Sequence, residues 1–145
     1  MKELVLFYSY SGAKNTKKAA EKFAQDNNFD ICEVIDQKRP NKLAAYTAGI
    51  VKVMKNSGRK IQPLMINGNA VNFGDYAVVN VFSPVWASHT TPSINSALKL
   101  IPPNTKIKLF MVSMSGKSEK DSQSKRIADL GLEVIGYDDI KDKNI

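Results

Sequence analysis

Short apolar runs alternate with stretches of helical periodicity along this 145-residue chain, and this alternation restricts its fold more than any other feature. The clearest apolar runs are residues 4–8, 77–82 and 107–112. Each is followed by a segment in which apolar residues recur every three or four positions. Continuous apolar runs indicate strands that are covered on both faces. Strands that alternate with helices indicate a parallel sheet joined by right-handed crossovers.

Weaker signals complete the pattern. Residues 31–35 have strand propensity, but polar residues interrupt the run, which is typical of an edge strand. A last strand is predicted at 133–137, and residues 59–74 are expected to form an irregular crossing with one extended piece. The predicted helices are residues 15–27, Leu43 to Met54, Pro92 to Ile101 with Thr91 as cap, and a helix capped by Ser118 with Asp121 that ends at Leu130.

The second predicted helix has its apolar positions at helical spacing: Leu43, Tyr46, Thr47, Ile50, Val53 and Met54. After Tyr137 the sequence is too short for a further full helix. The first helix would then lack a neighbour on its own face of the sheet, and a homodimer is one arrangement that would cover this face.

Length and composition predict one domain over residues 1–145, with 43% hydrophobic residues to form its core. No apolar run approaches the roughly 20 residues that span a bilayer, and a strand begins almost at Met1. We therefore expect a soluble cytoplasmic protein without a membrane partner. Because Cys32 is the only cysteine and His89 the only histidine, zinc and iron–sulfur sites are not expected.

The formal net charge is +7, which raises the question of nucleic-acid binding. Lysines 14, 17, 18 and 22 gather on the first predicted helix. They fall on the face opposite its apolar residues, and the chain has no arginine-rich arm or aromatic platform. A solvated basic face is therefore favoured over a nucleic-acid site.

The loop between the first strand and the first helix is rich in hydroxyl groups. It reads Ser9-Tyr10-Ser11-Gly12-Ala13-Lys14-Asn15-Thr16. Hydroxyl donors and free backbone N–H groups at the positive end of a helix can surround a phosphate without a metal ion. The sequence therefore predicts a phosphate site here, although an ordinary helix cap with spare serines would have the same composition.

Two more loops follow strands that end at the same edge of the sheet. Residues 83–92 contain the only tryptophan, Trp86, beside Pro84. A tryptophan in a loop is a candidate stacking surface for a flat ring, and the alternative is that it fills the end of the core. Residues 113–117 are small and polar, with Ser115 and Gly116 able to bring backbone donors close to a ring edge.

These loops and the strand order resemble those of the flavodoxins over nearly the whole chain. The resemblance rests on residues 4–12, on residues 15–21, and on Asp75-Tyr76 leading into Ser83-Pro84-Val85-Trp86-Ala87, the most specific element. It implies an α/β doubly wound fold with a five-stranded parallel sheet of order 2-1-3-4-5, here without the last helix. It also implies noncovalent FMN and a role in electron transfer. A carrier is favoured, and the open alternative is a small flavoprotein reductase, which would be an FMN-dependent oxidoreductase.

The resemblance also implies a set of cofactor-binding residues. Those near the phosphate would be Ser9, Tyr10, Ser11, Gly12, Ala13, Lys14, Asn15 and Thr16, and those around the ring Pro84, Val85, Trp86, Ala87, Ser115 and Gly116. No catalytic or metal-binding residue is implied.

The phosphate loop departs from the flavodoxin pattern at Lys14. Either this lysine replaces the final threonine of the motif, or Ala13-Lys14 is a two-residue insertion and Asn15-Thr16 keep their roles. The chain is also basic where flavodoxins are usually acidic, which should raise the reduction potential of a bound flavin. The competing hypothesis is a flavin-free protein of the same fold that docks an acidic partner through its basic face.

Overall fold

The structure of the chain is a computed structural model, which describes residues 2–10, 14–38, 41, 43 and 45–145. Its centre is a five-stranded parallel sheet of order β2-β1-β5-β6-β7. The strands are β1 (Lys2–Phe7), β2 (Asp30–Glu33), β5 (Tyr76–Pro84), β6 (Lys106–Ser113) and β7 (Glu133–Lys141). The helices are α1 (Asn15–Asn27), α3 (Ile50–Met54), α4 (Pro92–Leu100) and α5 (Lys120–Ala128).

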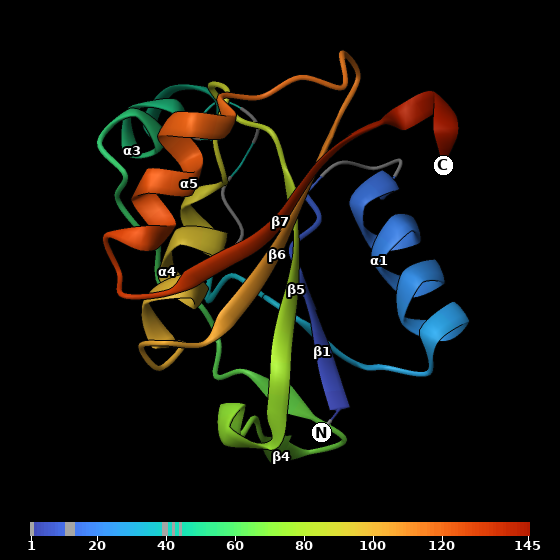
Figure 1. The fold of residues 1–145 in the computed structure, drawn as a ribbon. Helices are drawn as coiled ribbons and strands as arrows, with labels where there is room; N and C mark the ends of the chain where they lie inside the picture. The colour runs from blue at the N-terminus through green and yellow to red at the C-terminus, as the bar shows by residue number, and fades with distance from the viewer. Residues whose placement is uncertain (1, 11–13, 39–40, 42, 44) are drawn as a thin grey trace.

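Helices cover the sheet on both faces, with α1 on one side and α3, α4 and α5 on the other (Figure 1). In chain order of the sheet strands, the arrangement is 2-1-3-4-5, so the predicted fold class is confirmed. The predicted edge strand β2 lies at the edge. Within the part of the chain that the structure describes, only a short 3₁₀ turn, η3 (Asp142–Asn144), follows β7. No described helix is long and apolar enough to cross a membrane.

The two faces carry cores of different size. The larger core joins β1, β5 and β6 to α4 and α5 through fully buried residues such as Leu4, Ile94 and Ile127. The smaller core lies under α1, where the rings of Phe82 and Phe110 stack with centroids 4.4 Å apart and Phe23 packs against both. The continuous apolar runs of the sequence therefore became strands buried on both faces, as predicted.

Local signals fixed several helix ends. α1 spans the predicted residues 15–27, and Thr91 caps α4 as expected, its Oγ1 accepting a hydrogen bond from the Ile94 N–H at 3.3 Å. The predicted cap of α5 is wrong. Glu119 precedes that helix without a side-chain cap, and the Ser118 hydroxyl instead donates to Asp139 Oδ1 at 2.6 Å.

Three segments differ from the prediction. The second predicted helix is split into a π-helical turn, η1 (Ala45–Gly49), and the short α3. Of the apolar positions predicted for this helix, Leu43, Thr47 and Met54 are exposed, and only Val53 is buried among those whose side chains the structure describes. The irregular crossing contains a small antiparallel hairpin, β3 (Met65–Ile66) with β4 (Asn69–Ala70), and a 3₁₀ turn, η2 (Phe73–Asp75). β7 runs four residues beyond its predicted end at Tyr137, to Lys141, because it stays paired with β6 as far as Ser113.

Candidate functional site

A cavity of about 480 Å³ opens at the edge of the sheet where β1, β5 and β6 end. It is lined by Tyr10, Asn15, Thr16, Pro84, Val85, Trp86, Ser88, Val112, Ser113, Met114, Ser115, Lys117 and Asp142. In parallel α/β sheets, ligands bind at the carboxyl ends of the strands, and this volume is within the usual range for small-molecule sites. All three loops that the sequence analysis identified contribute to the lining.

Trp86 is fixed in the cavity wall by a tight turn. Its N–H donates to the His89 carbonyl and its carbonyl accepts from the His89 N–H, both at 3.0 Å. The two residues between them, Ala87 and Ser88, have φ values of 46° and 66°. Positive φ at both central positions is the geometry of a type I′ hairpin turn, which glycine or asparagine normally supplies. The turn that positions Trp86 therefore contains two residues in a strained backbone conformation.

The Trp86 ring is held by aromatic and cationic neighbours as well. Tyr10 contacts it edge-on, with ring centroids 5.6 Å apart, and Tyr8 does so at 6.5 Å. Arg59 places its guanidinium carbon 6.0 Å from the ring centroid. A Cβ atom at Gly49 would lie 3.0 Å from the indole, so this glycine allows the close approach of η1 to the ring.

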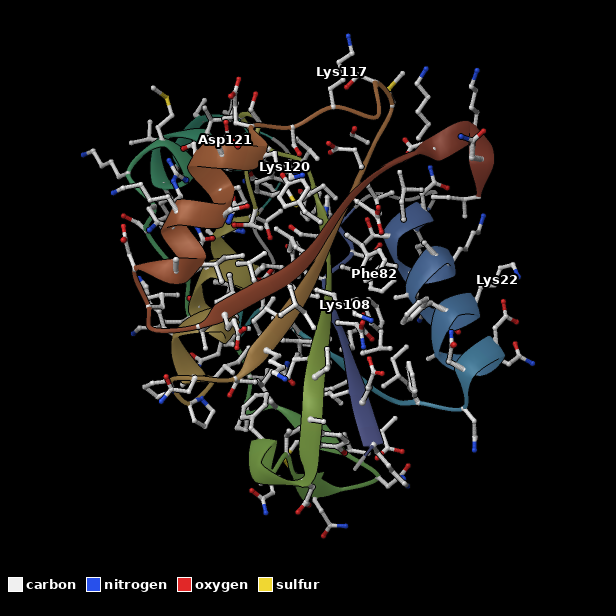
Figure 2. The ribbon with its side chains drawn as sticks, viewed as in Figure 1. Lys22, Phe82, Lys108, Lys117, Lys120 and Asp121 are labelled. Atoms are coloured by element: carbon white, nitrogen blue, oxygen red, sulfur yellow. The ribbon has the colours of Figure 1, made fainter. Side chains whose placement is uncertain are left out.

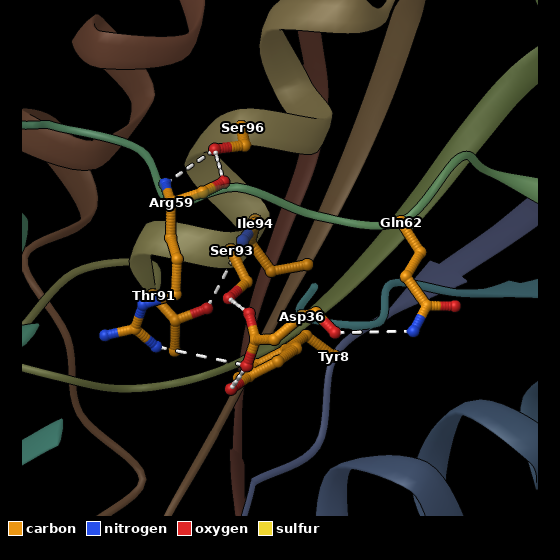
Figure 3. Close-up of polar contacts among 8 residues, drawn as sticks. All are labelled: Tyr8, Asp36, Arg59, Gln62, Thr91, Ser93, Ile94 and Ser96. Carbon is orange, nitrogen blue, oxygen red and sulfur yellow. Dashed lines mark hydrogen bonds and ion pairs between the residues drawn. The ribbon is translucent and has the colours of Figure 1, made fainter. Parts of the chain in front are cut away.

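A buried polar network connects Arg59 to the strand ends (Figure 3). Asp36, only 8% exposed, accepts hydrogen bonds from the hydroxyls of Tyr8, at 2.6 Å, and Ser93. Its Oδ2 also lies 4.0 Å from Arg59 Nη1. Ser96 fixes the backbone of Arg59, because its Oγ accepts from the Arg59 N–H at 2.7 Å and donates to the Arg59 carbonyl at 2.5 Å.

The network also affects the acidity of Tyr8. Burial, together with the hydrogen bond to Asp36, raises the pKa of Tyr8 well above its ordinary value near 10. The phenol therefore remains a hydrogen-bond donor at physiological pH. None of the members of this network was identified from the sequence, because Tyr8, Asp36, Arg59 and Ser93 come from four separate segments.

A second set of contacts fixes the turn from the side of α5. Gln123 Oε1 accepts from the Thr90 N–H at 2.9 Å, and the Glu119 N–H donates to the Ser88 carbonyl at 2.9 Å. His89 places Nδ1 2.9 Å from the Ala87 carbonyl and Nε2 2.8 Å from Ser122 Oγ. Because a carbonyl can only accept, Nδ1 carries the proton. His89 is therefore a hydrogen-bonding residue of the loop, as predicted.

Asn15 and Thr16, at the first turn of α1, line the cavity at the predicted phosphate site, and this part of the lining is called the phosphate wall. Lys14, the residue before this turn, has φ 54° and provides no side-chain cap for the helix. Uncapped amides and the helix dipole make such an end receptive to an anion. Ser9 Oγ is buried and has no hydrogen-bond partner among the described residues. Ser11, Gly12 and Ala13 lie outside the described residues.

This arrangement bears on the two alignments of the loop. Asn15 and Thr16 line the cavity, whereas Lys14 does not and its side chain is exposed. The residues that line the cavity are therefore the two that would keep their roles if Ala13-Lys14 is an insertion.

The third loop turns through Gly116, whose φ is 68°. Its N–H donates to Ser113 Oγ at 3.0 Å, and the Lys117 N–H donates to Ser115 Oγ at 3.2 Å. A Cβ atom at Gly116 would lie 2.4 Å from Cγ of Lys141, so this loop and the end of β7 are packed closely. Gly116 therefore shapes the loop, while Ser115 faces the cavity.

The structure thus brings seven predicted site residues together around one cavity: Tyr10, Asn15, Thr16, Pro84, Val85, Trp86 and Ser115. Ser9, Lys14, Ala87 and Gly116 lie beside it without lining it. The sequence analysis missed six lining residues: Ser88, Val112, Ser113, Met114, Lys117 and Asp142. Four of these belong to the strand end and loop that also contain Ser115; Asp142 was missed because β7 was predicted too short.

Metal chemistry has no support in the described residues, which contain no group of three or more histidine, cysteine, aspartate or glutamate side chains placed to hold a metal ion. Cys32 is buried, and burial raises the pKa of its thiol. Its position on β2 fits the predicted role in packing.

Solved structures similar to this chain are flavoproteins. A flavoprotein from Lactobacillus acidophilus NCFM, crystallised in complex with FMN, is 26% identical over 99% of this chain and 94% of its own, with a TM-score of 0.75. A putative flavoprotein from Bacteroides eggerthii covers 99% of this chain and 92% of its own at 19% identity, with a TM-score of 0.73. An NMR structure of the apo-form of the flavoprotein from Lactobacillus acidophilus NCFM covers 94% of this chain and 91% of its own at 20% identity, with a TM-score of 0.60.

A scan against models of protein families gives no match to the sequence, and neither does a search of curated proteins. The TM-score and coverage of these solved structures agree with the topology of the sheet. In its fold, the chain is a flavodoxin-like protein similar along almost its whole length to a flavoprotein crystallised with FMN.

Proposed function

We propose that this protein binds FMN noncovalently in the cavity and serves in electron transfer. The observation that carries the proposal is the convergence, in one cavity, of a helix end that the Lys14 side chain does not cap and an aromatic platform. The first suits a phosphate and the second a flat ring, and a flavin mononucleotide has both. The similarity to a flavoprotein crystallised with FMN supports the same ligand.

The residues present fit this cofactor. Asn15, Thr16 and the α1 amides would hold the phosphate. Ser9, the chain neighbour of the lining residue Tyr10, would add a hydroxyl that has no described protein partner. Trp86 would stack on the isoalloxazine, with Pro84 and Val85 shaping that side. Ser11, Gly12 and Ala13 belong to the same predicted phosphate loop. Bound FMN would supply one- and two-electron redox chemistry.

The chain's own groups argue for a carrier rather than an enzyme. His89 is engaged by Ala87 and Ser122, so it is not placed as a proton donor for a substrate. Tyr8, with its raised pKa, is committed to Asp36. The protein's part would be to bind, orient and partly desolvate the cofactor.

A fluorescence titration of the apo-protein with FMN, riboflavin and FAD tests the proposal. FMN should bind at least tenfold more tightly than riboflavin, because only FMN uses the phosphate wall. Trp86→Ala should weaken FMN and riboflavin alike, by about 1–3 kcal/mol of lost stacking. Absence of binding to all three ligands would overturn the proposal and favour the flavin-free docking protein.

A further inference from the structure

Four lysines lie on, or next to, the segments that line the cavity. Lys117 lines the cavity and lies on the loop beyond β6, at the end of the molecule shown uppermost in Figure 2. Lys141 lies against Gly116 in the same loop. Lys14 and Lys143 are the chain neighbours of the lining residues Asn15 and Asp142.

These four lysines provide positive charge that is not taken up in ion pairs among the described residues. All four side chains are exposed, and none forms an ion pair with another described residue. Asp142 is the one acidic residue among the described residues that line the cavity. The formal net charge of +7 adds to the same positive potential.

An exposed apolar side chain lines the same cavity as Lys117. Met114 is 87% exposed and lines the cavity together with Trp86 and Val85. An apolar centre with a charged rim is the usual anatomy of a protein–protein contact, and methionine is adaptable enough to pack against different surfaces. A side chain this exposed contributes little to the core, so Met114 is free to contact another molecule.

We propose that Met114 and the surrounding lysines, Lys14, Lys117, Lys141 and Lys143, form the docking surface for an acidic electron-transfer protein. The electron-transfer role of the partner rests on the proposed function, since a redox partner must approach the mouth of the cofactor cavity. That the partner is acidic follows from charge complementarity, which steers association and fixes orientation. Small contacts of this kind are typical of transient redox encounters.

The test uses a strongly acidic [2Fe–2S] ferredoxin as the probe and a basic c-type cytochrome as the opposite-charge control. The ¹⁵N-labelled protein is titrated with each by NMR, with and without FMN. We expect ferredoxin-induced shifts at residues 113–117 and 140–143 in both states, and an affinity that falls at least tenfold between 20 and 200 mM salt. Binding centred elsewhere, no binding at low salt, or equal binding of the cytochrome would overturn the proposal.

Matched charge reversals locate the surface. Lys141→Glu with Lys143→Glu should lower the affinity for ferredoxin about tenfold and flatten its salt dependence. The control, Lys99→Glu with Lys106→Glu, places the same charges at the amino end of the strands, since Lys106 begins β6 and Lys99 lies near the end of α4. It should change the affinity less than about twofold. Equal losses of ferredoxin affinity in the two double variants would show a general charge effect and overturn the proposal.

Met114→Gln separates the apolar contact from the charged rim. It should lower the affinity while leaving the salt dependence unchanged, because no charge is altered; an unchanged affinity would remove Met114 from the surface. Circular dichroism melts check that each variant is folded. Ferredoxin binding at this surface by a protein that binds no FMN would support the docking surface and overturn the proposed cofactor function alone.

Discussion

The two walls of the cavity differ in how much of their order comes from the protein itself. The wall that contains Trp86, called the ring wall here, holds this residue through a hydrogen-bonded turn, two tyrosines and the buried network of Asp36 and Arg59. The phosphate wall has a helix end that no side chain of Lys14 caps, and beside this wall lies a buried Ser9 hydroxyl without a described partner. The ring wall is therefore preorganised, whereas the phosphate wall retains polar groups that a ligand would satisfy.

The ring wall should be the more sensitive of the two to loss of a buried polar group. Asp36→Ala removes the acceptor of Tyr8 and Ser93 and leaves Arg59 buried without its counter-charge. We expect the free energy of unfolding of the apo-protein to fall by roughly 3 kcal/mol, measured by urea denaturation. The matched control is Asp26→Ala, which breaks the exposed pair with Lys22 and should cost less than about 0.5 kcal/mol. Similar losses in both variants would contradict a structural role for the network.

High pH should lower the free energy of unfolding, because Tyr8 in the ring wall then loses its proton. Because the folded-state pKa of Tyr8 is raised above 10, its contribution to stability is complete below pH 10 and is lost as the pH rises above that value. The loss for one such group approaches about 1.4 kcal/mol per pH unit, which urea midpoints between pH 9 and 11.5 would show. Tyr8→Phe should reduce this dependence but not abolish it, since burial and Asp30 also raise the pKa of Tyr76 to about 12. An unchanged pH profile in Tyr8→Phe would exclude Tyr8 as its source.

A substitution beside the phosphate wall should change the free energy of unfolding of the apo-protein in the opposite direction. Ser9→Ala removes a buried hydroxyl that lacks a described partner, so the free energy of unfolding without ligand should stay the same or rise by about 1 kcal/mol. FMN affinity should fall about tenfold, by loss of one hydrogen bond to an anion, while riboflavin affinity should not change. Parallel calorimetric titrations with the two ligands would reveal the difference. A fall in apo-protein stability would mean that the hydroxyl is already satisfied.

The smallest effect is expected at the turn that carries Trp86. Ala87 has φ 46°, which costs a residue with a side chain roughly 1 kcal/mol and glycine almost nothing. Ala87→Gly should therefore stabilise the apo-protein by about 0.5 kcal/mol after the greater chain entropy of glycine is subtracted. Thermal melts would detect this shift, and Ala48→Gly, at an exposed helical position, should destabilise instead. Destabilisation by Ala87→Gly would show that the turn is not strained.

Local signals account for what the sequence could predict. α1, the Thr91 cap of α4 and the order of the strands follow from periodicity, capping residues and crossover handedness, which act over short distances. Trp86 was found because it is a large ring in a loop. The hairpin at 65–70 carried a readable signal, Asn67-Gly68 with φ values of 51° and 80°, that was overlooked.

The supporting network could not be predicted in the same way. Asp36, Arg59 and Ser93 are contributed by separate segments, and only the packed fold brings their polar atoms together. The exposure of Leu43 and Met54 likewise depends on what the second helix packs against, and periodicity alone identified Val53 but not the exposure of these two residues. The length of β7, and with it the position of Asp142, was set by pairing with β6 rather than by local propensity.

Amide hydrogen exchange of the apo-protein, repeated after addition of FMN, tests the difference between the two walls most directly. The Trp86, His89 and Thr90 amides donate to protein acceptors and should be protected in both states. The Asn15, Thr16 and Lys17 amides, in the first turn of α1, should exchange quickly without ligand and become protected at least tenfold by FMN but not by riboflavin. Equal protection of both groups without ligand, or no change on adding FMN, would contradict the account.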